Sequence, residues 1–243
     1  MSLVQYGTTC SIDGVNSFTS FCADLKERNT SSYKLTRNLS KYVGGHKILH
    51  GYEAYAIGSM NLIFYVYGEP TQATNVKTEA QKNASKLAAA LNECVLTFDD
   101  ESSEYPAGLE EYTVEDSGVD GWFIVTAKVS CVKRMPLVNQ TISGTTGEIN
   151  NPGSLISGAK IATELSDTSF SMTDMSGIQI NCWELTSGTE FCIDGLEGKV
   201  TQNNVNYFQH TDITQFPIIT PGSNEIHFSK NYCSIQFYPL FYL

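Results

Sequence analysis

The stretch of sequence that decides the fold is QATNVKTEAQKNASKLAAALN, residues 72–92. Apolar residues recur there every three or four positions, which is the period of an amphipathic α-helix. Lysines and Glu79 lie on the opposite face, and Pro70 with Thr71 provides a helix start signal. Because a helix with one apolar stripe must bury that stripe, this helix is predicted to dock on a sheet.

Sequence typical of β-strands flanks the helix on both sides, with aromatic and β-branched residues gathered in short runs. Strands are expected at 3–8, 11–15, 33–39, 47–55 and 60–67 before the helix, and at 95–98, 109–115 and 122–131 after it. An Asp13-Gly14 turn signal lies inside the second of these runs. The first domain is therefore predicted to be β-rich with one α-helix.

The periodicity is lost between residues 133 and 158, where glycine and proline accumulate. This change places a domain boundary near Lys133, so the domains are expected at 1–133 and 134–243. Further strands are expected at 178–185 and 189–194 around Ser187-Gly188, at 199–202 and 205–208 around Asn203-Asn204, and near 218, 225–229 and 234–238. Short strands at this spacing predict a β-sandwich, and the chain as a whole is predicted to be mainly β.

The formal net charge of −11 and the isoelectric point near 4.7 restrict the possible partners. Binding to a nucleic-acid backbone needs clustered Lys and Arg, whereas the 15 basic residues of this chain are scattered. Sequence-specific nucleic-acid binding and binding to an anionic membrane are therefore not expected. The apolar run 62–67 is far shorter than the ~20 residues that span a bilayer, and a secretory pattern is not evident at the N-terminus, so folding in cytoplasm is expected.

The cysteines and histidines give weak signals for chemistry. The seven cysteines have no C-x-x-C pair and are expected to be buried, reduced thiols. His46 and His50, with Glu53 close behind, have a spacing that could hold a metal on a helix, but the surrounding glycines favour a turn-rich hairpin with surface histidines. His210 and His227 have no nucleophile motif beside them.

The densest group of carboxylates is formed by residues 99–101 and Glu104. An acid and base pair of the glycosidase type is formally possible there, but a solvated turn explains this composition better. A Gly-rich phosphate loop is not found after any expected strand. No catalytic residue, metal site or cofactor is therefore predicted, and the protein is not expected to be an enzyme.

Several short motifs, taken in order, resemble the distal tail protein family of long-tailed bacteriophages. In the second half they are Cys192-Ile193-Asp194, Gly198-Lys199-Val200, Asn203-Asn204-Val205-Asn206, Phe216-Pro217-Ile218 and Pro221-Gly222-Ser223-Asn224-Glu225-Ile226. In the first half they are Ser11-Ile12-Asp13-Gly14-Val15 and Leu96-Thr97-Phe98-Asp99-Asp100 around the helix, with Asn150-Asn151-Pro152-Gly153 similar to an interdomain linker. The chain departs from the family at Asn203-Asn204, where many relatives have Asn-Gly, and at 238–243, which lacks the expected arginines. It also lacks a large insertion of the kind that carries a carbohydrate-binding module in some relatives.

This resemblance implies a fold and a function. The C-terminal domain would be a galectin-like β-sandwich, and the N-terminal domain would form a hexameric ring at the virion tail tip. The ring would be a hub joining the tail tube protein, a tail-associated spike protein and receptor-binding or peripheral baseplate proteins, with DNA passing through its centre. Assembly would take place in the bacterial host cytoplasm.

Two further hypotheses compete with a hub. A carbohydrate-binding β-sandwich for attachment to the host surface would need an exposed Trp122 or Trp183, and a cell-wall hydrolase ranks last. For the oligomer interface we predict Tyr42, Tyr52 and Tyr55, because tyrosine is enriched in interface cores. The alternative is that these tyrosines pack on their own sheet.

Overall fold

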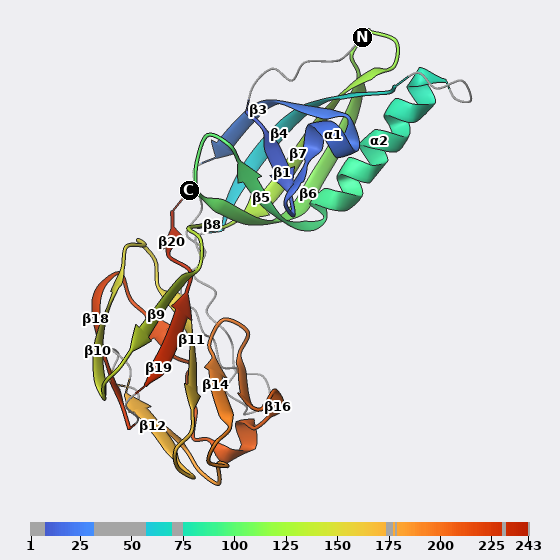
Figure 1. The fold of residues 1–243 in the computed structure, drawn as a ribbon. Coiled ribbons are helices and arrows are strands. Elements are labelled where there is room, and N and C mark those ends of the chain that lie inside the picture. Colours follow the sequence, from blue (N-terminus) through green and yellow to red (C-terminus); the bar gives the residue numbers. More distant parts are fainter. Residues whose placement is uncertain are drawn as a thin grey trace, which may run out of the picture. The chain divides into compact units, whose positions relative to one another are not determined.

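The structure of the protein is a computed structural model that describes residues 8–31, 57–69, 75–173, 177, 179–229 and 232–242. These residues fall into two compact units, and the chain passes from the first to the second between Met135 and Pro136 (Figure 1). The sequence places its boundary near Lys133. In the described part of the chain, no helix is long and apolar enough to cross a membrane.

The N-terminal unit is built on one antiparallel sheet. Its strands are β1 (Cys10–Ile12), β2 (Val15–Asn16), β3 (Ala23–Ser31), β4 (Gly58–Tyr67), β5 (Glu93–Phe98), β6 (Glu104–Asp116) and β7 (Trp122–Cys131). They are ordered β2-β1-β5-β6-β7-β4-β3, and the short β8 (Lys133–Arg134) pairs with β6. The long strands β4, β6 and β7 thus form the centre of the sheet, with shorter strands toward one side.

Each central strand alternates between a buried and a less buried side, as its sequence pattern requires. On β7 the residues Phe123, Val125, Ala127 and Val129 are buried, while those between them are partly exposed. Helix α2 (Val76–Leu91) packs on the buried side through a stripe that includes Leu87. We call this side of the sheet the inner face and the opposite side the outer face.

The sheet curls, because β3 lies close to β5 although three strands separate them in the sheet order. The guanidinium of Arg28 on β3 lies 4.1 Å from the ring centroid of Phe98 at the end of β5. Ile12, Leu96 and Phe64 therefore belong to one apolar core inside the curl. Burial of these large side chains is the main force that holds the N-terminal unit together.

A second, short helix α1 (Ser17–Phe21) was not expected from the sequence. Five residues are too few to show a helical period. The helix is held instead by its cap: the side-chain oxygen of Asn16 accepts hydrogen bonds from the backbone N–H groups of Phe18 and Thr19 at 2.8 and 3.2 Å. Helix α2 is the only long helix among the described residues, as the sequence predicts for the first domain.

The C-terminal unit is a β-sandwich. One sheet has the order β10-β18-β12-β13, and the other β16-β15-β14-β11-β19-β9, with β17 paired to β11. Their bounds are β9 (Val138–Ile142), β10 (Thr146–Asn151), β11 (Ser157–Glu164), β12 (Phe170–Thr173), β13 (Gln179–Cys182), β14 (Glu190–Asp194), β15 (Lys199–Gln202), β16 (Val205–Asn206), β17 (Ile218–Ile219), β18 (Gly222–Phe228) and β19 (Cys233–Phe237). The single-turn 3₁₀ helix η1 (Phe208–His210) follows β16, and β20 (Leu240–Phe241) is the last strand. Residues of both sheets, such as Ile149 and Ile226 on one and Ile161 and Ile235 on the other, share one core.

The fold class expected from the sequence is confirmed: the chain is mainly β, with one main helix in the first unit and a two-sheet sandwich in the second. The Asn203-Asn204 turn is also confirmed, since both residues have positive φ and β15 pairs with β16 across them. Helix α2 begins at Val76 after an Asn75 cap. The expected start signal at 70–71 and the expected strands at 33–39 and 47–55 lie outside the described residues, as does most of the strand expected at 3–8.

The segment 133–158, where the sequence shows no clear periodicity, contains β8, β9, β10 and the start of β11. Two expectations are wrong. Residues 150–153 are no linker, because Asn150 and Asn151 end β10 within the C-terminal unit and pair with Ser223 and Gly222. Strands β13 and β14 do not form a hairpin across Gly188, since they belong to different sheets.

We expect Leu87→Ala to lower the free energy of unfolding of the N-terminal unit by about 2–5 kcal/mol, because Leu87 is 0% exposed and its removal leaves a cavity beneath α2. The neighbouring Lys86→Ala changes an exposed side chain and should stay within about 0.5 kcal/mol of the wild type. Urea unfolding followed by circular dichroism measures both. Equal stabilities of the two variants would contradict the packing of α2 described above.

Candidate assembly surfaces

Among the described residues, the sheet of the N-terminal unit has two long strand segments that lack a partner strand on one side. Strand β3 pairs with β4, and no other described strand continues the sheet beyond it. Strand β6 pairs with β5 only over residues 104–108, so its outer part, residues 110–116, is bonded to β7 alone within the described chain. We call these segments the β3 edge and the outer β6 edge. Each offers backbone N–H and C=O groups on which another strand could add.

The two edges carry different side chains. The β3 edge presents Lys26, Glu27 and Asn29, all exposed. The outer β6 edge is acidic, with Glu110, Glu111, Glu115 and Asp116 all exposed. Charged residues on an edge strand also prevent indiscriminate aggregation, so these edges favour selective pairing over random pairing. Because the two edges differ in sequence, a contact between them would join unlike patches of two copies.

The outer face of the sheet is polar with an aromatic and aliphatic centre. Tyr65, Ile124 and Ile63 lie on it and are partly exposed. Its lysines are occupied by neighbouring groups: Lys128 Nζ lies 2.8 Å from Glu110 Oε2, and Lys26 Nζ lies over the Tyr65 ring at 5.0 Å. Carboxylates outnumber lysines on this face and along the outer β6 edge, so both are expected to carry net negative charge.

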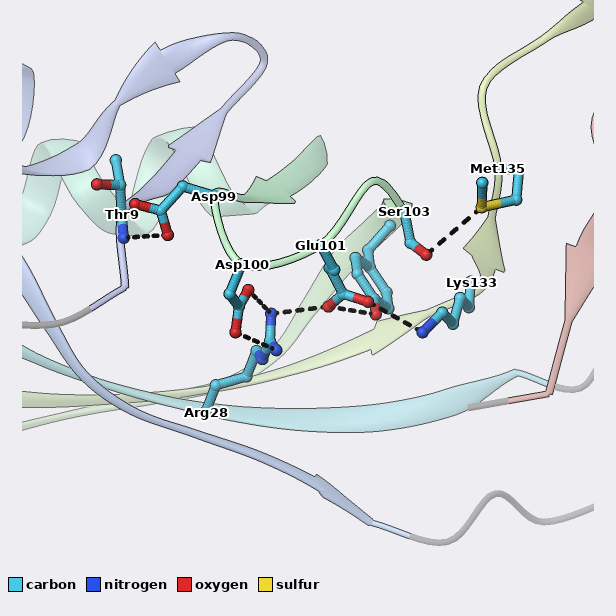
Figure 2. Close-up of polar contacts among 9 residues, drawn as sticks. Thr9, Arg28, Asp99, Asp100, Glu101, Ser103, Lys133 and Met135 are labelled. Atoms are coloured by element: carbon cyan, nitrogen blue, oxygen red, sulfur yellow. Dashed lines mark hydrogen bonds and ion pairs between the residues drawn. The ribbon is translucent and has the colours of Figure 1, made fainter.

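A network of charged residues closes the curled sheet at the turn between β5 and β6. Arg28 reaches Asp100 Oδ2 at 3.1 Å and Glu101 Oε1 at 2.9 Å, and Lys133 Nζ reaches Glu101 Oε2 at 2.9 Å. Tyr105 donates its phenolic hydrogen to Glu101 Oε1 at 2.7 Å. Figure 2 shows Glu101 at the centre, between Arg28 from β3 and Lys133 from β8. The network therefore ties three elements that lie far apart in the sequence.

The electrostatics of Glu101 follow from these contacts. Partial burial raises the pKa of its carboxyl, but hydrogen bonds from Lys133 and Tyr105, with the charges of Lys133 and Arg28, outweigh burial and hold the pKa below its usual value of 4.5. The charged form of Glu101 is thus favoured in the folded protein. The sequence predicts a solvated acidic turn here, whereas the turn is ion-paired because the curl of the sheet brings Arg28 to it. No local pattern in the sequence reveals this contact.

The predicted interface residues Tyr42, Tyr52 and Tyr55 lie outside the described residues, as do His46, His50 and Glu53. They stay predictions. In the part of the chain that is described, no group of three or more His, Cys, Asp or Glu side chains could hold a metal ion.

The two described histidines lie on the C-terminal unit, His210 in η1 and His227 in β18. His210 Nδ1 contacts Glu184 Oε2 at 2.9 Å. His227 contacts Thr146 Oγ1 at 3.1 Å and Glu225 Oε1 at 3.7 Å, on a surface where its side chain is 55% exposed. A hydroxyl, an imidazole and a carboxylate thus meet at His227, but in open solvent and not in the enclosed site that nucleophilic catalysis requires.

All seven cysteines are free thiols, as the sequence predicts. Six are buried, and burial raises the pKa of Cys10 and Cys131 to about 12 and that of Cys233 to about 11. Thiols with such high pKa values react slowly at neutral pH. The six buried cysteines therefore offer little reactivity, and partial burial also raises the pKa of the seventh, Cys22.

Comparisons with known proteins find this fold in a solved structure. No protein-family model and no curated protein matches the chain. A two-unit, β-rich fold of this kind is found in the crystal structure of the Dit protein of phage SPP1, with a TM-score of 0.72, 16% sequence identity, 97% of this chain covered and 100% of that chain. That protein is described as a paradigm of the hub adsorption apparatus in phages that infect Gram-positive bacteria.

Two structures of the phage P2 baseplate in its activated conformation, with calcium and with strontium, align less closely. Their TM-scores are 0.49 and 0.47, both at 11% identity, with 96% and 95% of this chain covered and 98% of each matched chain. The chain has the fold of the SPP1 Dit protein. The family expected from the sequence motifs is confirmed at the level of the fold.

We expect Glu101→Gln to lower the melting temperature at pH 7 and to have a smaller effect at pH 3. The folded-state pKa of Glu101 lies below its unfolded value, so its charge stabilises the fold above about pH 4.5 and this contribution is lost as the pH falls through the folded pKa. Thermal melts of both proteins at the two pH values measure this. Asp120→Asn, an exposed change in the β6–β7 turn, is the matched control, and an equal loss from both variants at pH 7 would contradict the network.

Proposed function

We propose that the protein is a structural hub at the distal end of a phage tail. The observation that carries this proposal is the similarity of fold to a protein described as a hub of the adsorption apparatus. The similarity extends over 97% of this chain. The surface agrees with an assembly role: the N-terminal unit has two unlike strand edges and a polar outer face. A hub works by holding other proteins in place and needs no catalytic group.

The ring is the first part of this proposal. Copies joined through two different patches form a closed ring when the rotation between neighbours closes, and an open filament when it does not. The β3 edge and the outer β6 edge are two such patches, and their pairing would continue the sheet from one copy to the next. A ring of six is the number implied by the resemblance to distal tail proteins. The predicted contacts of Tyr42, Tyr52 and Tyr55 would add to this interface.

The partners are the second part. In the proposed assembly the ring contacts the tail tube protein on one side and a tail-associated spike protein on the other. The C-terminal sandwich would contact receptor-binding or peripheral baseplate proteins. The virion tail tip is then the final location, reached after assembly in the bacterial host cytoplasm.

The charge of the chain agrees with a channel for DNA. A net charge of −11 and an outer face rich in carboxylates would repel passing phosphates and would not bind them. Electrostatic repulsion of this kind lets DNA move through the centre of a ring without sticking. No specific contact with DNA is part of the proposal.

Disulfide trapping tests the edge-to-edge contact. We expect Asn29→Cys on the β3 edge, combined with Glu111→Cys, Thr113→Cys or Glu115→Cys on the outer β6 edge, to give a ladder of covalent multimers after mild oxidation. These residues are exposed on the outer face, and neighbouring strands lie about 4.8 Å apart, within reach of a disulfide. The three combinations scan the register. Multimers are counted on a non-reducing gel.

The single-cysteine variants are matched controls. Unlike patches meet at a head-to-tail contact, so Asn29→Cys alone should give no ladder. Wild-type protein should give none because six of its seven thiols are buried and partial burial raises the pKa of the seventh, Cys22. Ladders from the single variants as strong as from the pairs would contradict a heterologous contact. The absence of a ladder for every pair, at concentrations where light scattering detects multimers, would exclude these two edges as the interface.

A further inference from the structure

The outer face of the N-terminal sheet carries a groove that crosses β5, β6 and β7 and has a volume of about 660 Å³. Val95 pairs with Pro106, and the backbone N–H of Val132 donates to the carbonyl of Pro106 at 3.2 Å, so these three residues form one row across the sheet. All three are partly exposed, and Ile57, which is 51% exposed, precedes β4 at the same groove. We call the hollow lined by these four residues and Gly108 the outer-face groove.

Gly108 leaves the space in this groove. It lies inside β6 and pairs with Glu93 on one side and Ser130 on the other, so that the row between them has no side chain. A Cβ at this position would lie 3.7 Å from the carbonyl oxygen of Asn92 and 3.8 Å from Ser130 Oγ, which are ordinary contacts. The backbone of Gly108 is not left-handed, and the irregular pairing of β6 with β7 begins only after Leu109. The sheet itself therefore does not require glycine here, and glycine inside a strand often marks a close approach by another chain.

The rim of the groove is acidic. Asp13 Oδ1 accepts the backbone N–H of Val95 at 2.8 Å, and the N–H of Asp13 donates to the carbonyl of Val95 at 2.9 Å. These bonds fix the Asp13 carboxylate beside the groove and leave lone pairs on its second oxygen. Glu93 is exposed and has no ion-pair partner in the described part of the chain. The residues that line the groove include two carboxylates and no lysine, arginine or histidine.

We propose that the outer-face groove binds an extended segment of another protein that presents one bulky apolar side chain with lysine or arginine on both sides. The apolar side chain fills the space over Gly108 and packs on Val95 and Val132. The basic residues pair with Asp13 and Glu93. Such a contact is weak by itself, in the millimolar range, because one side chain and exposed ion pairs supply it. This inference rests on the proposed hub function, for which it names the chemistry of one partner segment.

The groove fits this occupant better than three others. A small molecule is usually bound in an enclosed pocket, whereas this groove is open to solvent. A nucleic acid needs basic residues, and the rim has only carboxylates. A second copy would need a large exposed apolar side chain next to a lysine or arginine. Among the described residues, none of the large exposed apolar side chains has such a neighbour in the sequence.

Photo-crosslinking to the full chain tests the groove, because it captures weak contacts and needs no ring. The probe is the peptide Gly-Lys-Lys-photoleucine-Lys-Lys-Gly, whose central leucine carries a diazirine. A comparison probe has glutamate at the four lysine positions. Unlabelled peptides with a Lys-Lys-Leu-Lys-Lys or a Lys-Lys-Ser-Lys-Lys centre serve as competitors. Mass spectrometry measures the extent of labelling and locates the labelled residues.

We expect saturable labelling at residues of the outer-face groove, which the leucine competitor lowers and the serine competitor does not. Gly108→Val fills the space and should reduce labelling by about fivefold or more, and Gly108→Ala should reduce it less. The double variant Asp13→Asn with Glu93→Gln should also reduce labelling by about fivefold. An asparagine oxygen at position 13 can still accept the N–H of Val95, so the turn is kept.

Two matched controls lie in the C-terminal unit. Gly144→Val adds the same side chain at a glycine whose Cβ would meet nothing closer than the Thr146 carbonyl oxygen at 3.5 Å. Glu164→Gln removes one exposed carboxylate. Both variants should label as the wild type does, and circular dichroism checks that every variant folds.

Four outcomes would overturn the inference. They are no saturable labelling of the groove, equal labelling by the glutamate probe, equal competition by the serine peptide, and full labelling of the folded glycine variants. Failure here is distinct from failure of the hub. A chain that forms rings but is not labelled contradicts only the groove, whereas a chain that is labelled but forms no rings contradicts only the ring.

Discussion

The rest of the structure depends on how the inner face of the N-terminal sheet is buried. Curling brings β3 to the end of β5, so that Phe98, Leu96 and Phe64 share one core, and α2 covers what remains open. The ion pairs of Arg28 with Asp100 and Glu101 stabilise the curled sheet. Because these side chains are partly exposed, the ion pairs contribute less to stability than the apolar core. The core therefore sets the shape of the sheet, and the network sets where β3 ends up relative to the β5–β6 turn.

Within the described residues, this arrangement covers one face of the sheet and leaves two strand edges without a partner strand. A protein that evolved to stay monomeric usually shortens or covers such edges, whereas here the outer part of β6 runs on for residues 110–116 beside β7 alone within the described chain. Charge limits what can add there. The acidic outer β6 edge favours a partner segment that is not itself acidic, and on the β3 edge Lys26 offsets the charge of Glu27. Shape and charge thus agree with repeated contact between unlike edges of identical copies.

Much of the fold could be predicted from the sequence, because local patterns record it. The alternation from Trp122 to Cys131 and the helical period before Leu91 are strong signals, and both elements are where they were expected. The failures have physical causes. Helix α1 depends on one capping side chain, Asn16, and β9 and β10 are polar strands without clear alternation. The ion-paired turn at Glu101 depends on contacts between distant segments, which a single sequence does not record.

The most direct test of the central claim, that copies of this chain close into a ring through their N-terminal units, is electron microscopy of the purified full chain over a range of concentrations. The account predicts ring-shaped particles with a central hole and cyclic symmetry, which become more abundant as the concentration rises. Particles of a single chain at every concentration, with and without a tail tube protein added, would contradict it.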